Sequence, residues 1–291
     1  MHETDPSSDR TDASSQDGDA AARSGVPPLP DLRDVEPTEG AIDAPAQEDP
    51  AAFADPELSR RVLLLEIVSV LLFAALPHLV HSLYLFGEAG EAAPGSIPGA
   101  STFVSHWIPL FLLSLQVFVP LLWIMARAPG GLARFADFRL RPLRDGGAAI
   151  AVGCAGFVIT SLWTATFYPI LQPLLSFLDP PMAVDWVPPS SFVEWGVVAA
   201  AYLLSAAAEE LAMRVYLITR LIQIGLPQVV AVLAAGLVFA SYHVYQGGWA
   251  TTWVFWFGMV YGIAFLLTRR FWPLTLAHCA VNVITAASWT E

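Results

Sequence analysis

The chain has 291 residues, of which 55% are hydrophobic and only 14% are charged, and its mean hydropathy is +0.56. Because a soluble globular chain carries about a quarter charged residues, this composition excludes that class and indicates a polytopic membrane protein. The net charge of −12 argues against nucleic acid as a partner.

The excess of acidic over basic residues is confined to the N-terminal segment. Residues 1–58 contain fifteen Asp or Glu residues and three Arg residues, which account for the whole net charge of −12. The segment is rich in Ser, Asp, Pro and Ala and has little apolar surface to bury. This composition predicts a disordered acidic tail rather than a folded domain.

Seven apolar runs follow the tail, each long enough to approach the roughly 30 Å of a bilayer core. We predict an all-α, polytopic transmembrane helix bundle with a region of about three spans over residues 59–190 and a core of about four spans over residues 191–291. The predicted spans are 62–86, 103–126, 147–171, 192–216, 228–246, 251–268 and 273–290.

The arginines fall on alternate sides of these spans. The segments 87–102, 172–191 and 247–250 contain no Arg, whereas the other connections and the segment before the first span do. By the positive-inside rule, we expect a cytoplasmic N-terminus and tail and an outside C-terminus. The location that we expect for this integral protein is a bacterial cell membrane.

Two adjacent carboxylates, Glu209 and Glu210, interrupt the fourth apolar run. A carboxylate near the bilayer centre costs roughly 3 kcal/mol, so it marks a functional site facing the bundle interior. Successive α-helical side chains diverge by about 100°, so we expect the two glutamates not to face one spot. Glu210 and Arg214 are four residues apart, which predicts a buried pair and leaves Glu209 as the free carboxylate.

Three further polar residues lie in the later spans. His243 follows Phe239 by one turn near the end of the fifth span, and His278 and Asn282 share one face of the last helix. Each has a structural alternative, such as an interfacial histidine or an interhelical hydrogen bond. Glu66, His78 and His81 of the first span remain, and we interpret these two histidines as packing or interface residues.

A carboxylate and two imidazoles on different helices can form a hydrolytic centre. Glu209 could take a proton from water while neutral His and Asn side chains donate hydrogen bonds to an oxyanion. The same set, Glu209, His243 and His278, could instead bind a divalent metal such as Zn²⁺ with an open water position. The sequence leaves these two chemistries open, and no cofactor is certain.

The three motifs resemble those of one known family. Glu209-Glu210-Leu-Ala-Met-Arg214 resembles the Glu-Glu-x-x-x-Arg motif of the CPBP intramembrane proteases, also called the CAAX prenyl protease 2 or Abi family. Phe239-Ala-Ser-Tyr-His243 and His278-Cys-Ala-Val-Asn282 match the family's Phe-x-x-x-His and His-x-x-x-Asn/Asp motifs in order and approximate spacing. The resemblance covers roughly residues 192–290.

The resemblance implies a membrane-embedded, glutamate-dependent endopeptidase of a family often labelled metalloproteases. Glu209 and His243 would activate water, and His278 and Asn282 would stabilise the oxyanion. Glu210, Arg214 and Phe239 would support the site. The implied partners are the lipid bilayer and a membrane-anchored protein or peptide substrate.

The alternative hypothesis is a non-enzymatic transporter or a bacteriocin-immunity-type factor that uses the same intramembrane polar cluster. Transporters of this kind often have duplicated halves. The segments 62–171 and 192–290 show no repeat, which disfavours this alternative.

Overall fold

The computed structural model describes residues 59–88, 103–178 and 189–288. The predicted disordered tail, 1–58, lies outside these residues. Within them every regular element is helical, and the β-type pairing is limited to one isolated bridge between Asp137 and Arg270. The predicted all-α class is therefore confirmed.

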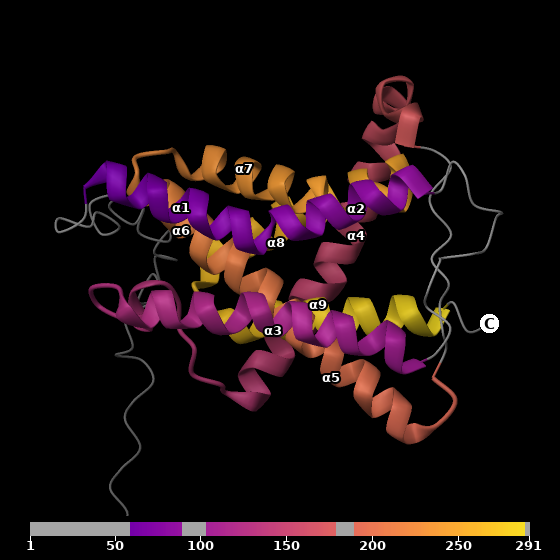
Figure 1. Ribbon diagram of the computed structural model, residues 1–291, viewed down its shortest axis with the longest axis horizontal. Coiled ribbons are helices and arrows are strands. Elements are labelled where there is room, and N and C mark those ends of the chain that lie inside the picture. Colours follow the sequence, from indigo (N-terminus) through magenta and orange to yellow (C-terminus); the bar gives the residue numbers. More distant parts are fainter. Residues whose placement is uncertain (1–58, 89–102, 179–188, 289–291) are drawn as a thin grey trace, which may run out of the picture. The chain divides into compact units, whose positions relative to one another are not determined.

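Figure 1 shows how the helices of the described ranges are arranged. Nine segments are α-helical, and four short segments have other helical geometries, among the residues that the structure describes. In chain order they are α1 (Arg60–Ala74), α2 (Leu76–Glu88), α3 (Phe103–Arg127), η2 (Leu132–Arg134), α4 (Pro142–Leu175), η3 (Ser176–Leu178), α5 (Phe192–Glu209), η4 (Glu210–Ile218), α6 (Thr219–Gln223), α7 (Gln228–Ser241), η5 (Val244–Gln246), α8 (Gly247–Thr268) and α9 (Phe271–Ser288).

Each of the seven predicted spans coincides with an apolar helical segment, but their lengths differ. Five segments in the described ranges are long and apolar enough to cross a membrane: Arg60–Tyr84, Trp107–Arg127, Pro142–Leu178, Phe192–Gln223 and Val244–Thr268. The fifth and seventh predicted spans correspond to the shorter helices α7 and α9. With 14 residues, α7 extends only about 21 Å, less than the hydrocarbon thickness.

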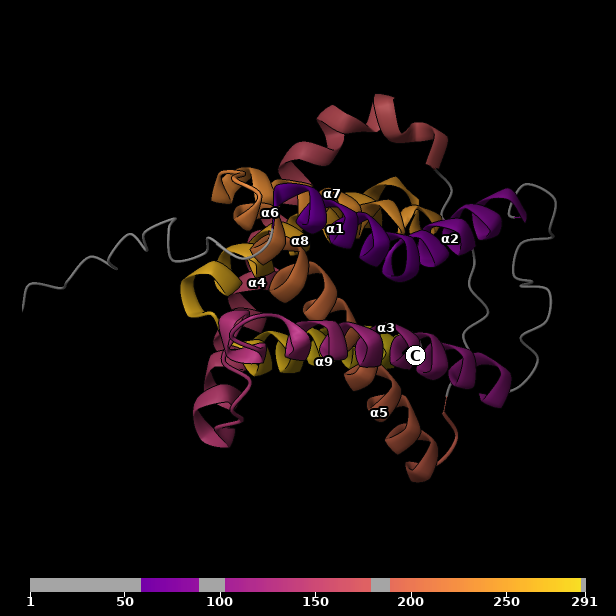
Figure 2. The same ribbon diagram turned by 60° about the vertical axis from the view of Figure 1, so that its left-hand side comes forward.

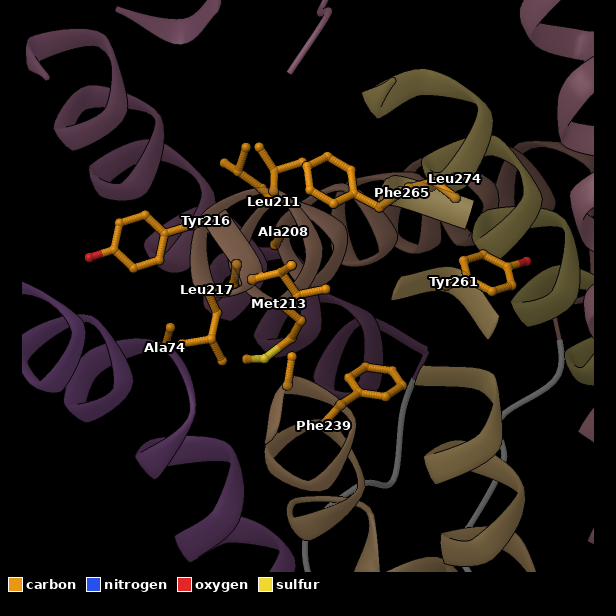
Figure 3. Packing of buried hydrophobic residues seen from close by; sticks show 14 of the residues in the cluster. Ala74, Ala208, Leu211, Met213, Tyr216, Leu217, Phe239, Tyr261, Phe265 and Leu274 are labelled. Carbon is orange, nitrogen blue, oxygen red and sulfur yellow. The ribbon is translucent and has the colours of Figure 1, made fainter. Parts of the chain in front are cut away.

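The segment that carries both glutamates forms one continuous helical rod. α5, η4 and α6 follow one another without a break and run obliquely to α3 (Figure 2). α3 and α9 pack against α5, and α7 packs against η4. In Figure 3, Met213 and Leu217 of η4 extend toward Ala74 of α1, and Phe239 of α7 lies near Met213. This rod therefore contacts both the N-terminal and the C-terminal helices.

Glycines allow α7 and α8 to approach closely. A Cβ atom on Gly258 of α8 would lie 3.1 Å from the Cα atom of Gly236 on α7. A Cβ atom on Gly262 would lie 2.8 Å from Cγ1 of Val232, a distance that real side chains do not tolerate. Small residues at helix interfaces are typical of membrane bundles, where packing rather than water exclusion drives association.

Glu66 of α1 joins the first helix to this rod. Its Oε1 accepts hydrogen bonds from the hydroxyl of Tyr216 at 2.9 Å and from Nε and Nη2 of Arg220 at 3.0 and 2.8 Å. Arg220 is 1% exposed, and its guanidinium also stacks on Phe135. The sequence left Glu66 without a role, and the structure assigns it to the junction between α1 and α6.

The connection between α3 and α4 is fastened to the turn between α8 and α9. The backbone N–H of Asp137 donates to the carbonyl of Arg269 at 2.8 Å, and the indole N–H of Trp272 donates to the carbonyl of Phe138 at 2.8 Å. The backbone N–H of Arg139, and the guanidinium groups of Arg141 and Arg270, hold the pKa of the exposed Asp137 carboxyl below its usual range.

A buried ion pair reinforces this connection. Nη2 of Arg270 lies 2.7 Å from Oδ1 of Asp145, whose side chain is completely buried. The other carboxylate oxygen of Asp145 accepts the backbone N–H of Arg141 at 2.6 Å and so caps the start of α4. The buried charge of Asp145 is thus compensated by an ion pair at one oxygen and by a hydrogen bond at the other.

We predict that Asp145→Asn lowers the free energy of unfolding by about 3 kcal/mol, because it leaves the buried Arg270 without its nearest counter-charge. The measurement is unfolding by sodium dodecyl sulfate in mixed micelles. The control is Arg144→Gln, which changes the exposed neighbouring residue and should alter the free energy by no more than about 0.5 kcal/mol. Equal stability of the two variants would contradict the prediction.

Candidate active site

The two glutamates lie at the junction between two kinds of helix. α5 ends at Glu209, and Glu210 begins η4, a π-helix that extends to Ile218. π-helical turns are rare and occur frequently at functional sites. Every residue of η4 is buried, so this unusual backbone lies inside the bundle.

Both carboxylates contact the same imidazole. Nδ1 of His278 on α9 lies 2.8 Å from Oε1 of Glu210, and Nε2 of the same ring lies 3.5 Å from Oε2 of Glu209. The expectation that the two glutamates do not face one spot is therefore wrong. A π-helix has a wider turn than an α-helix, which brings successive side chains closer in angle, and a flat ring offers a nitrogen to each of them.

The predicted pairing of Glu210 with Arg214 is confirmed. Nη1 of Arg214 lies 3.3 Å from Oε1 of Glu210, and the side chains are 1% and 0% exposed. The contact is an ion pair rather than an aligned hydrogen bond, since Nη1 has no hydrogen-bond partner among the described residues. The guanidinium carbon lies 4.2 Å from the ring centroid of Phe239 and within 6 Å of those of Phe257 and Tyr261. These rings compensate the buried cation through cation–π attraction.

The contacts of His278 fix where its hydrogens lie. An ionised carboxylate can only accept, so Nδ1 donates its hydrogen to Glu210. Nε2 then faces Glu209 either with a hydrogen of its own or as a lone pair opposite a protonated carboxyl group. In both arrangements Glu209 and Nε2 of His278 together carry one proton.

His243 lies just beyond α7, which ends at Ser241. Its Nδ1 lies 2.8 Å from the carbonyl oxygen of Phe239, which can only accept, so Nδ1 carries the hydrogen. In the neutral ring, Nε2 then has a free lone pair. The ring centroid lies 4.9 Å from that of Phe239 and 4.7 Å from that of Tyr242. His243 is therefore held in a tautomer that can accept a proton at Nε2.

Phe239 packs against both His243 and His278, two predicted site residues that do not contact one another directly. Its buried ring lies 6.1 Å from the ring of His278 as well as beside His243. In the described part of the chain, no hydrogen bond joins Glu209 to His243. Asn282 lies one turn beyond His278 on α9, half-buried, and its side chain forms no hydrogen bond with another described residue. The structure thus brings Glu209, the pair of Glu210 with Arg214, and His278 into contact, while His243 joins them through Phe239.

A pocket with room for about one water molecule lies beside Glu209. Residues of α1, α2, α3, α5 and η4 line it, together with Tyr242. The lining residues are Ala74, His78, Ser114, Val117, Ser205, Ala208, Glu209, Ala212, Met213 and Tyr242. His78 and Tyr242 line this pocket but were not predicted as site residues, although a histidine within an apolar span is itself a signal of function.

The predicted metal ligands are only partly assembled. Glu209 and His278 lie together, but both nitrogens of His278 face carboxylates. Among the residues that the structure describes, no group of three His, Cys, Asp or Glu side chains is placed to hold a metal ion. The residues as placed do not fit the three-ligand site.

The comparisons with known proteins agree with the motifs. Residues 191–284 match a family model described as Type II CAAX prenyl endopeptidase Rce1-like. No curated protein and no solved structure matches the chain. The matched segment runs from the start of α5 almost to the end of α9 and contains both glutamates, Arg214, His243, His278 and Asn282. Residues 191–284 are therefore similar to the Rce1-like type II CAAX prenyl endopeptidases, a family of proteases.

Proposed function

We propose that this protein is an intramembrane endopeptidase that hydrolyses a peptide bond next to a lipid-anchored or membrane-embedded segment of a protein or peptide. The observation that carries the proposal is the contact of Glu209 and Glu210 with opposite nitrogens of one buried imidazole, beside a water-sized pocket. Burial keeps bulk water from screening these charges, which strengthens their effect on a reacting group.

In the proposed reaction, Glu209 takes one proton from a water molecule in the pocket while the water oxygen attacks the peptide carbonyl. Once it has taken this proton, Glu209 is neutral and no longer attracts the hydrogen on Nε2 of His278. That hydrogen then becomes available to the developing oxyanion, together with the amide of Asn282. Glu209 finally passes its proton to the leaving amine. His243, with its free Nε2, assists the proton transfer.

Glu210 and Arg214 have a supporting role in this proposal. Glu210 accepts the Nδ1 hydrogen of His278 and so fixes the ring with Nε2 toward Glu209. Arg214 supplies the opposite charge beside Glu210 at a completely buried position. This arrangement of carboxylate, histidine and reacting group is the one by which hydrolases commonly set a histidine tautomer.

The contacts between Arg-bearing segments support the proposed orientation. The connection before α4 is hydrogen-bonded to the turn before α9, and α1 is paired with Arg220 at the end of the rod. These segments therefore lie at one end of the bundle, as a cytoplasmic face would require. The proposed location is a bacterial cell membrane, and the proposed partners are the bilayer and the membrane-anchored substrate.

We predict that Glu209→Gln lowers kcat by at least about 100-fold, because the amide cannot accept the proton of water. The measurement uses the protein in lipid nanodiscs and a quenched fluorescent peptide with a farnesylated C-terminal CAAX sequence. The control is Glu194→Gln on the same helix, whose carboxylate accepts from Ser190 at the helix start and should be dispensable for cleavage. Equal activity of the two variants would remove the proposed base.

We predict that His243→Ala lowers kcat by about 100-fold without loss of the folded state, because the ring supplies a proton acceptor at Nε2. The matched control is His81→Ala, which removes an exposed ring from α2. A second experiment tests complementation in cells whose phenotype depends on this protein. Full complementation by a Glu209→Gln, His278→Ala double variant would instead favour the transporter or immunity-type function.

A further inference from the structure

The pocket beside Glu209 has a wall that does not belong to the matched family segment. Its lining includes Ala74 and His78 from the first span and Ser114 and Val117 from α3, all outside residues 191–284. The N-terminal helices therefore close the space in which a water molecule would contact Glu209. This inference rests on the proposed function and adds a residue to it.

The polar groups of this pocket suit one bound water. A buried water needs about two to four hydrogen-bonding partners. The lining offers Glu209, His78, Ser205 and Tyr242, whereas the hydroxyl of Ser114 already donates to the carbonyl of Leu110 at 2.7 Å. The pocket therefore has partners enough to hold a water molecule against the carboxylate.

His78 is one of the unsatisfied groups in this pocket. Neither of its ring nitrogens forms a hydrogen bond with a described residue, yet the ring is half-buried within a membrane-spanning helix. Its centroid lies 5.5 Å from that of Tyr242, which fixes the ring against the pocket wall. Unsatisfied polar groups at membrane depth are costly and are retained mainly where they function.

His78 and His243 both pack against Tyr242, with ring centroids 5.5 and 4.7 Å from it. His243, however, is not among the residues that line the pocket, whereas His78 is. His81, one turn further along α2, is exposed. The position of His78 is thus distinct both from the predicted catalytic histidine and from its own helical neighbour.

We propose that His78 is a further catalytic residue, which hydrogen-bonds the water that Glu209 activates. The water donates one hydrogen to Glu209 and the other to an unprotonated nitrogen of His78, so that its oxygen lone pair is directed away from both. When the oxygen bonds to the peptide carbonyl carbon, Glu209 carries the first proton to the leaving amine as the C–N bond breaks. His78 takes the second from the new carboxylic acid and releases it to solvent.

Two substitutions distinguish the contribution of the hydrogen-bonding nitrogens of His78 from that of its aromatic packing. His78→Phe keeps the packing on Tyr242 but removes the hydrogen-bonding atoms, and His78→Gln keeps a polar atom but removes the ring. We expect His78→Phe to lower kcat by about 10- to 100-fold with KM changed less than about twofold, since the water rather than the peptide is contacted. His78→Gln should retain more activity than His78→Phe. His81→Phe is the matched control and should match the wild type.

Wild-type kcat in His78→Phe, or a loss in His78→Gln as large as that in His78→Phe, would overturn the inference while the proposed function stands. Undiminished cleavage by Glu209→Gln would instead refute the proposed function.

A second measurement does not depend on cleavage. The imidazole ¹⁵N resonances of the histidine-labelled protein are assigned to His78 by their absence in His78→Phe. A water bridge predicts that they shift in Glu209→Gln and not in Glu194→Gln. Resonances of His78 that are the same in all three backgrounds would also overturn the inference.

Discussion

The rest of the site depends on the complete burial of Glu210. A carboxylate inside a membrane bundle needs an opposite charge and hydrogen bonds, since an uncompensated one would cost several kcal/mol. Arg214 supplies the charge from the same helix, and His278 supplies the hydrogen bond from α9. Arg214 in turn requires the aromatic faces of Phe239, Phe257 and Tyr261 from α7 and α8. One buried charge thus links four helical elements.

These contacts of Glu210 and Arg214 also determine how His278 and Glu209 are placed. Because Glu210 fixes the ring of His278, the opposite nitrogen of that ring is directed at Glu209. Glu209 is 18% exposed, so unlike Glu210 it has access to the small pocket between the N-terminal helices and the rod. The two adjacent glutamates therefore differ in environment rather than in direction. One is buried and paired, and the other is available to water.

Much of this arrangement could be predicted from local spacing. The helical class follows from apolar composition, and the Glu210–Arg214 pair follows from its four-residue separation. The contact of both glutamates with His278 could not be predicted, because nothing in the sequence indicates that the backbone becomes π-helical at Glu210. The role of Glu66 and the position of His78 in the pocket depend on contacts between segments more than a hundred residues apart. The shortness of α7 follows from the turn at Tyr242, which places His243 outside the helix that its apolar pattern indicated.

The most direct test of this account is a double-mutant cycle on the free energy of unfolding, with Glu210→Gln, His278→Ala and the two combined. The account predicts a coupling energy of about 1–3 kcal/mol, because each residue satisfies the other at a buried position. Glu194→Gln combined with His278→Ala should be additive, since Glu194 lies at the other end of α5 and is bonded to Ser190. Additivity of Glu210→Gln and His278→Ala within about 0.5 kcal/mol would contradict the account.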